Sequence, residues 1–261
     1  PWPVLPDGLG PSLELIDASA DNSLPRNWAA ATNTPGHSAR AANSVAGALG
    51  PDLTAVTGPT TRPAANTPIT ISATVNGAAD TVTLFYRVGF AAEQSLPMTG
   101  DNGTYTAQIP GVSAGALVRY RVAAQGGGGT TSLPRTDDSM PYQGVVAAHG
   151  VTSQIPIFEW FMDPADYAAV TARPTAQIRR RAILAYDGVV WDNIMASIKG
   201  QSTQTSPKPS WKLEFPHNHD FTMPGLIEPV DEFALQADWS DRARGKAYLS
   251  WEVARLAKLA N

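Results

Sequence analysis

The chain of 261 residues carries a formal net charge of -4, and only 16% of its residues are charged. No basic footprint is present, so a nucleic-acid partner is not expected. Cysteine is absent, which excludes disulfides and thiolate metal sites. The apolar runs fall short of the roughly 18 to 20 residues that cross a membrane, so no membrane span is expected.

Residues 1–44 contain one alternating run, Ser12 to Asp17, among Asn, Pro, Ala and Gly at turn positions, so this segment buries little by itself. Together with Asp7-Gly8-Leu9-Gly10, Asn27-Trp28 and Thr34-Pro35-Gly36, it resembles the C-terminal end of a bacterial lamin tail domain. The resemblance implies a remnant of a larger β domain. Residues 45–65 are rich in Ala, Gly, Pro and Thr, which is typical of an exposed linker.

Residues 66–148 contain four short runs with period-two alternation, separated by turn residues, and this predicts an antiparallel β-sandwich. The apolar positions of these runs are Ile69 to Val75, Val82 to Val88, Tyr105 to Ile109 and Val118 to Ala124. The phrases Thr81 to Arg87 and Val118 to Val122 resemble those of fibronectin type III-like or immunoglobulin-like modules.

Residues 152–261 predict a mixture of strands and helices. Asp163-Pro164 is typical of a helix start, with an N-cap carboxylate and proline at the first helical position. Asp187-Gly188 lies between two apolar runs and predicts a two-residue hairpin turn. A helix is expected from Asp238 or Ser240 to Leu259. The predicted fold class is therefore mixed and multidomain, with an all-β sandwich followed by an α+β region.

Two basic strands flank a loop of small residues in this last region. Lys199 and Lys208 border the loop that begins at Gly200 and includes Ser202, and Lys212 lies on the strand that follows. Glycine and hydroxyl side chains let a phosphate approach the backbone closely, and lysines neutralise its charge. From composition alone, a lysine and glutamate alternation is more often a solvated sheet face than a ligand site.

The stretches Lys199-Gly200-Gln201-Ser202-Thr203 and Pro207 to Phe215 resemble the N-terminal lobe of the CotH family of atypical, spore-coat-type protein kinases. The resemblance implies ATP and Mg²⁺ as cofactors of a parent protein, a protein substrate, and an incomplete kinase-like lobe over residues 152–261. It implies nucleotide contacts by Lys199, Gly200, Ser202, Lys208, Lys212 and, within Asp238 to Arg244, Arg242. No catalytic residue is expected within this chain, because the family places its catalytic carboxylates beyond the position of Asn261, so the chain alone is predicted to be inactive.

A second hypothesis is an extracellular structural, adhesive or fibre-forming surface protein with a degenerate kinase-like lobe, which self-associates through cut domain edges. Under both hypotheses the protein is expected to be exported to the cell surface or beyond. Its export signal is expected outside this chain, because Pro1 to Val4 has no signal-peptide character. A metal site at His217, His219 and Asp220 is not favoured, since the two histidines are only two residues apart and no partner pair is evident.

Overall fold

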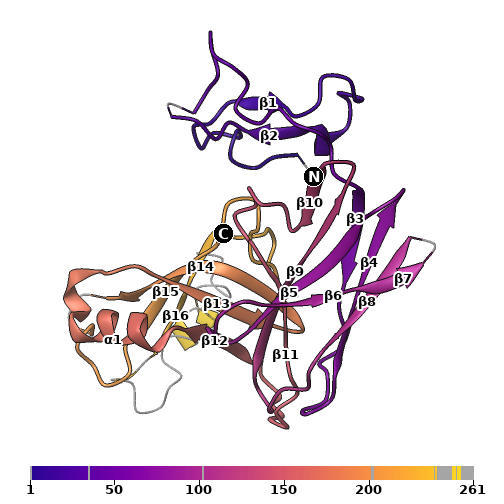
Figure 1. Cartoon of the computed structure of the whole chain (residues 1–261). Helices are drawn as coiled ribbons and strands as arrows, with labels where there is room; N and C mark the ends of the chain where they lie inside the picture. The colour runs from indigo at the N-terminus through magenta and orange to yellow at the C-terminus, as the bar shows by residue number, and fades with distance from the viewer. Residues whose placement is uncertain are drawn as a thin grey trace. The chain divides into compact units, whose positions relative to one another are not determined.

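The structure is a computed structural model, and it describes residues 2–34, 36–101, 103–200 and 203–237, together with Trp239, Leu249, Ser250, Glu252 and Val253. The chain divides into two compact units. Unit 1 comprises Pro1–Phe161, Ile183–Asn193 and Pro216–His219, and unit 2 comprises Met162–Ala182, Ile194–Phe215 and Asp220–Asn261. Strands dominate both units among the residues described (Figure 1).

The N-terminal part of unit 1 is a small two-stranded antiparallel sheet. Strands β1 (Leu13–Leu15) and β2 (Trp28–Ala30) pair, and the 3-10 helix η1 (Pro25–Asn27) leads directly into β2. Asn27 is fully buried. Its side-chain amide donates to the Asp17 carbonyl at 2.9 Å and accepts from the Asp17 N–H at 2.8 Å. These bonds satisfy backbone groups that so short a sheet leaves unpaired.

Two antiparallel sheets form the sandwich that follows. One has the strand order β3-β4-β8-β7, and the other has the order β10-β9-β5-β6, with β11 also pairing with β9. Their bounds are β3 Asp52–Thr57, β4 Ile69–Asn76, β5 Thr81–Val88, β6 Gln94–Pro97, β7 Thr99–Asp101, β8 Thr104–Ile109, β9 Leu117–Gly126, β10 Gly129–Leu133 and β11 Gln143–Val146.

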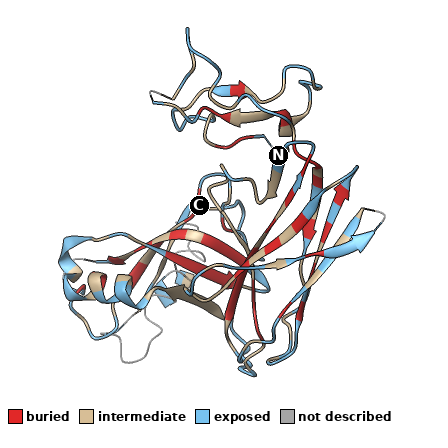
Figure 2. Cartoon of the chain, in the orientation of Figure 1, coloured by how far each residue is buried: buried red, intermediate tan, exposed pale blue. Residues whose placement is uncertain are grey.

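The core of the sandwich follows from the alternation of its strands. Ile71 on β4, Leu84 on β5 and Val122 on β9 are completely buried, while their neighbours along each strand point away from the core. Figure 2 shows buried residues, in red, along strands of this sandwich. The prediction of an antiparallel sandwich is confirmed.

Strand β3 lies inside the stretch that the sequence predicted to be an exposed linker, so the sandwich begins earlier than expected. Its pairing with β4 shifts register between Leu53 and Ala55. Because of this bulge the buried residues of β3, Leu53 and Val56, are three positions apart rather than two.

The third large sheet has the order β12-β13-β14-β15-β16. Its strands are β12 Phe158–Met162, β13 Arg180–Tyr186, β14 Val189–Lys199, β15 Ser210–Glu214 and β16 Glu232–Leu235, and helix α1 (Pro164–Ala172) and the 3-10 helix η2 (Pro174–Ala176) lie between β12 and β13. The predicted helix start is confirmed, since the Asp163 carboxylate accepts from the Ala165 N–H at 2.8 Å. The hairpin turn is confirmed by the positive φ of Asp187 and Gly188, 47° and 82°.

This sheet does not support a kinase-like α+β lobe, and that part of the predicted fold class is wrong. Between residues 152 and 237, five strands of the sheet accompany only one α-helix of nine residues, and the chain is mostly β. The helix predicted from Asp238 or Ser240 to Leu259 falls almost entirely outside the described residues. Within the part of the chain that the structure describes, no helix is both long and apolar enough to cross a membrane.

Candidate functional site

The predicted phosphate-binding lysines lie on a sheet face in unit 2. Lys199 ends β14 opposite Ser210, and Lys212 on β15 lies opposite Ser197, so the register puts both lysines on one face of the sheet. The opposite face packs, because Trp211 is buried and stacks on Tyr167 of α1 with ring centroids 6.0 Å apart. The Lys212 ammonium lies 2.9 Å from a Glu214 oxygen and 2.5 Å from a Glu232 oxygen.

The other predicted contacts are dispersed. Lys208 is exposed in the loop before β15, and Gly200 has a φ of 119° at the end of β14. Ser202 and Arg242 lie outside the described residues. What the structure brings together here is therefore the Lys212 ammonium between two carboxylates, one of which, Glu214, also pairs with Arg179. The charge of the lysine is neutralised in this arrangement.

The two histidines at which a metal site was not favoured make contacts with residues 138 and 139. His219 Nε2 lies 2.5 Å from an Asp138 oxygen, and the His217 carbonyl accepts from the Ser139 hydroxyl at 2.6 Å. Across the described ranges no three His, Cys, Asp or Glu side chains are grouped so that they could hold a metal ion.

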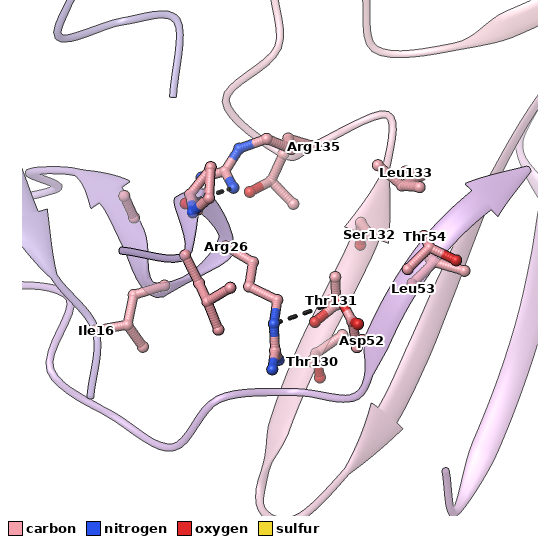
Figure 3. A pocket seen from close by; sticks show the side chains of 14 residues that line it. Ile16, Arg26, Asp52, Leu53, Thr54, Thr130, Thr131, Ser132, Leu133 and Arg135 are labelled. Atoms are coloured by element: carbon pink, nitrogen blue, oxygen red, sulfur yellow. Dashed lines mark hydrogen bonds and ion pairs between the residues drawn. The ribbon is translucent and has the colours of Figure 1, made fainter. Parts of the chain in front are cut away.

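A pocket of about 340 Å³ lies in unit 1, between the N-terminal β1/β2 segment and the edge strands β3 and β10 of the sandwich (Figure 3). We call it the junction pocket. Its apolar lining is aliphatic and consists of Ile16, Leu24, Pro25, Ala29, Leu53 and Leu133. Its polar lining includes Arg26, Asp52, Thr130, Thr131, Ser132 and Arg135. This volume and this mixture of apolar surface with a few convergent polar groups are typical of small-molecule sites.

Arg26 and Asp52 form an ion pair in the lining of the pocket, with Arg26 Nε 3.4 Å from Asp52 Oδ1 (Figure 3). Each is held by a second contact: Arg26 donates to the Gly50 carbonyl at 3.2 Å, and the other Asp52 oxygen accepts from the Asn76 side chain at 3.1 Å. About a third of each side chain remains accessible, 31% for Arg26 and 35% for Asp52. The pair therefore offers donors and acceptors to a ligand without having to move.

Arg135 fixes the N-terminal segment to the sandwich. Its guanidinium donates to the Trp28 carbonyl at 2.7 Å and pairs with Asp137 at 2.9 Å. Gly50 supports the same junction from the other side, because a Cβ at this position would lie 2.6 Å from the Thr130 backbone. Only glycine lets this segment approach β10 so closely.

The outer face of the β5/β9 sheet carries a second polar cluster, and its groups satisfy one another. Arg121 lies over the Phe85 ring at 4.1 Å and donates to both Glu93 oxygens at 2.6 and 3.1 Å, and Tyr142 also donates to Glu93. Burial favours the protonated acid, but the hydrogen bonds from Arg121 and Tyr142 outweigh it and lower the pKa of Glu93.

A buried ion pair adjoins this cluster. Arg119 and Asp192 lie 3.0 Å apart, and Asp192 is only 1% exposed. Burial raises the pKa of Asp192 above its ordinary value, and the attraction of Arg119 only partly opposes this. A face whose charges are paired and covered in this way has little left to offer a ligand.

The outer face of the β4/β8 sheet is rich in hydroxyl groups and carries no charge on its central strands. We call it the hydroxyl face; it consists of Thr70, Ser72, Thr74, Thr104, Thr106 and Gln108. A hollow of about 430 Å³ borders it and includes Leu96, Pro97 and Thr99.

Sequence reasoning missed the junction pocket. Its lining comes from residues 16–29, 52–54 and 130–136, which are far apart along the chain. Thr130, Thr131 and Ser132 form a run of three hydroxyl residues in the sequence, but such a run does not by itself predict a binding site.

The family model that matches the chain is carbohydrate binding module family 56, over residues 60–132. Among solved structures, the chain is similar to one titled as the crystal structure of a Br derivative of BhCBM56, with 20% sequence identity, 33% of this chain and 89% of that chain covered, and a TM-score of 0.27. No curated protein matches the chain.

The family match overturns the resemblances drawn from the sequence. Residues 60–132 match a carbohydrate-binding family rather than a fibronectin type III-like or immunoglobulin-like module, and the assignments to the CotH family and to a lamin tail domain are wrong. The prediction of a fragment of an ATP-dependent protein kinase is wrong for the same reason. ATP and Mg²⁺ were expected only through that resemblance and lose their basis with it.

Proposed function

We propose that the sandwich is a carbohydrate-binding module and that the protein attaches to a polysaccharide. The observation that carries this proposal is the family match over residues 60–132. The matched residues extend from before β4 into β10. They therefore cover the strands of the two-sheet sandwich except β3 and β11. A match that coincides with a folded unit is stronger than one confined to a short motif.

The proposal fits the second hypothesis from the sequence, a surface protein, better than it fits an enzyme. A module that binds carbohydrate serves to hold its protein on a glycan, and such proteins commonly work outside the cell. We therefore propose an extracellular location and an adhesive role. This role needs a binding surface but no catalytic group.

The matched residues limit how a sugar is bound. They contain no tryptophan, and the aromatic side chains among them, Phe85, Tyr86, Phe90, Tyr105 and Tyr120, are all buried or half-buried. Exposed aromatic rings offer sugars a flat apolar face, and this module lacks them among its described residues. Aliphatic side chains and hydroxyl or charged groups must take over that role.

The test is retention of the full chain by polysaccharides. We expect the chain to be slowed in native gels cast with at least one neutral soluble glucan, mannan or xylan, or pulled down by an insoluble one such as cellulose or chitin. Serum albumin run beside it serves as the reference for non-specific retardation. If no glycan in the panel retards the chain more than albumin, the proposal is wrong.

A further inference from the structure

We propose that the junction pocket is the sugar-binding site and that the pocket selects uncharged glycans through Arg26 and Asp52. The N-terminal side of the pocket is an essential part of this site, although it lies outside the matched family residues. This inference rests on the proposed carbohydrate binding and adds the site and the ligand class. The relevant geometry is the placement of the Arg26 guanidinium and the Asp52 carboxylate in the lining of a single pocket together with Thr131 of β10 (Figure 3).

Unused hydrogen-bonding groups are the first argument. All of Thr130, Thr131 and Ser132 line the pocket, but they alternate between the two faces of β10. Thr131 lies opposite the buried Ala124, on the same face as the pocket residue Leu133, and in the described part of the chain its hydroxyl has no hydrogen-bond partner. Polar groups in a half-buried site are normally satisfied by protein, water or ligand. The Thr131 hydroxyl, which both donates and accepts, is thus available to the hydroxyls of a sugar.

The charge balance of the pocket is the second argument. The Arg26 cation is matched by Asp52 at 3.4 Å, and the Arg135 cation is matched by Asp137 at 2.9 Å. An anionic sugar bound here would lie beside the Asp52 carboxylate, and a cationic one beside Arg26, so either would meet a like charge. A neutral sugar meets neither penalty, because its hydroxyls can donate to the carboxylate and accept from the guanidinium.

The N-terminal segment supplies groups that the sandwich lacks. Arg26, together with the apolar side chains of Ile16, Leu24 and Pro25, comes from residues 16–29, which precede the family match. Without this segment, the pocket would be an open edge between β3 and β10. Arg135 holds the segment in place through the Trp28 carbonyl at 2.7 Å.

The other two polar surfaces of the sandwich are weaker candidates. On the β5/β9 face, the partners of Arg121 and Glu93 are within the cluster itself. The hydroxyl face has free hydroxyl groups, but its residues come from adjacent strands of one flat sheet, and the hollow at its border has no charged residue in its lining. A surface of this kind gives a sugar less burial and weaker hydrogen bonds than the junction pocket does.

Five variants of the full chain test the inference. Asp52→Asn keeps the shape of the side chain and removes its charge, and Thr131→Val does the same for a hydroxyl. Ala29→Phe fills the pocket from the N-terminal side and leaves Arg26 and Asp52 in place, with Ala29→Ser as its matched control. Thr104→Val is the control on the hydroxyl face. Thermal unfolding identifies any variant that fails to fold, and such a variant is left out of the comparison.

The ligands are neutral oligosaccharides of glucose, mannose and xylose, with oligogalacturonate as the anionic and chitosan oligomers as the cationic comparison. Isothermal calorimetry gives the affinities. We expect a neutral oligosaccharide to bind, and its affinity to fall by about tenfold or more in Asp52→Asn and in Ala29→Phe. For Asp52→Asn the reason is that a hydrogen bond to a charged group is worth about a factor of ten or more. We expect a smaller loss of affinity in Thr131→Val and no change in Ala29→Ser or Thr104→Val.

Failure of this inference differs from failure of the proposed function. If a glycan binds but its affinity is unchanged in both Asp52→Asn and Ala29→Phe, the junction pocket is not the site, while carbohydrate binding stands. The same holds if Thr104→Val alone abolishes binding. If oligogalacturonate binds best and Asp52→Asn strengthens it, the selection for uncharged sugars is wrong. If no carbohydrate binds, both proposals fall.

Discussion

The junction pocket in unit 1 and the β15 strand in unit 2 both present basic side chains next to carboxylates, yet they differ in what surrounds the pair. Lys212 lies on an open sheet face, and its ammonium is shared by Glu214 and Glu232, which are directly opposite each other in the register. Arg26 and Asp52 lie in a pocket that also includes Thr131, whose hydroxyl has no protein partner in the described residues.

The comparison teaches that a basic residue in a sequence pattern does not by itself mark a binding site. The lysine between two glutamates relieves the repulsion of two like charges on neighbouring strands, which is a structural role. The arginine in the pocket makes one ion pair and one backbone contact and still has accessible surface. Concave shape and unused hydrogen-bonding groups, rather than charge alone, distinguish the two regions.

The largest effects are expected from substitutions in the two cores, because each should lower the stability of one unit and not of the other. Leu84 lies in the sandwich core, Leu213 lies on β15, and both are completely buried. We expect Leu84→Ala and Leu213→Ala each to lower the free energy of unfolding of its own unit by about 2 to 5 kcal/mol. Urea titration followed both by fluorescence and by glycan binding measures this effect.

Only Leu84→Ala should move the urea midpoint of glycan binding to lower concentration, because every residue that lines the junction pocket belongs to unit 1. Leu213→Ala is its matched control in unit 2. A shift of the binding midpoint in Leu213→Ala as large as that in Leu84→Ala would show that the two regions cannot be treated separately.

A smaller effect is expected from Lys212→Ala. The ammonium is partly exposed, and exposed ion pairs contribute at most about 1 kcal/mol. Its removal leaves Glu232 opposite Glu214, which keeps its ion pair with Arg179. We therefore expect a loss of stability of at most about 1 kcal/mol that shrinks at high salt, since salt screens surface charges. Chemical denaturation at low and high ionic strength measures it.

Glycan affinity should be unchanged in Lys212→Ala, in contrast to Asp52→Asn. Lys212→Gln, which keeps most of the side-chain length without the charge, is the control for lost packing. A large, salt-independent loss in Lys212→Ala that Lys212→Gln does not share would assign the effect to packing of the lysine stem rather than to its charge.

Most of the sandwich and the start of the last region were predictable because their signals are local. The alternation of Ile69 to Val75 and of Val82 to Val88 is the alternation of their burial, and Asp163-Pro164 and Asp187-Gly188 adopt the cap and the turn that their chemistry favours. Strand β3 was missed because the bulge at Leu53 and Ala55 breaks the period of two.

The candidate site was not predictable because no local pattern encodes it. Arg26, Asp52 and Thr131 are brought together only when β3 and β10 form neighbouring edges of the sandwich and Arg135 fastens the N-terminal segment beside them. The lysine pattern around β15 misled because alternation predicts that Lys212 and Glu214 share a face but not that Glu232 of another strand faces them.

The smallest effect that we expect is a dependence of the free energy of unfolding on pH. It comes from Asp138, which is close in sequence to the pocket residues Arg135 and Thr136. Asp138 follows Asp137, the partner of Arg135, and its carboxylate contacts His219 Nε2 at 2.5 Å and the Met140 N–H at 2.9 Å. Burial disfavours the charged carboxylate, but the hydrogen bonds from His219 and Met140 and the nearby Arg135 outweigh it, so the pKa of Asp138 lies below its ordinary value.

A carboxyl group with a lower pKa in the folded than in the unfolded state stabilises the fold fully above its unfolded pKa, and this contribution is lost as the pH falls through the folded pKa. The free energy of unfolding of unit 1 should therefore decrease on acidification below the ordinary range of aspartate. Asp138→Asn should flatten that part of the profile, whereas Lys212→Ala should keep it. Urea denaturation from about pH 6 to about pH 3 measures both profiles. If the free energy of unfolding of Asp138→Asn falls with pH as steeply as that of the unchanged chain, the acid sensitivity of unit 1 comes from another carboxylate. The contact between Asp138 and His219 would then not stabilise this unit.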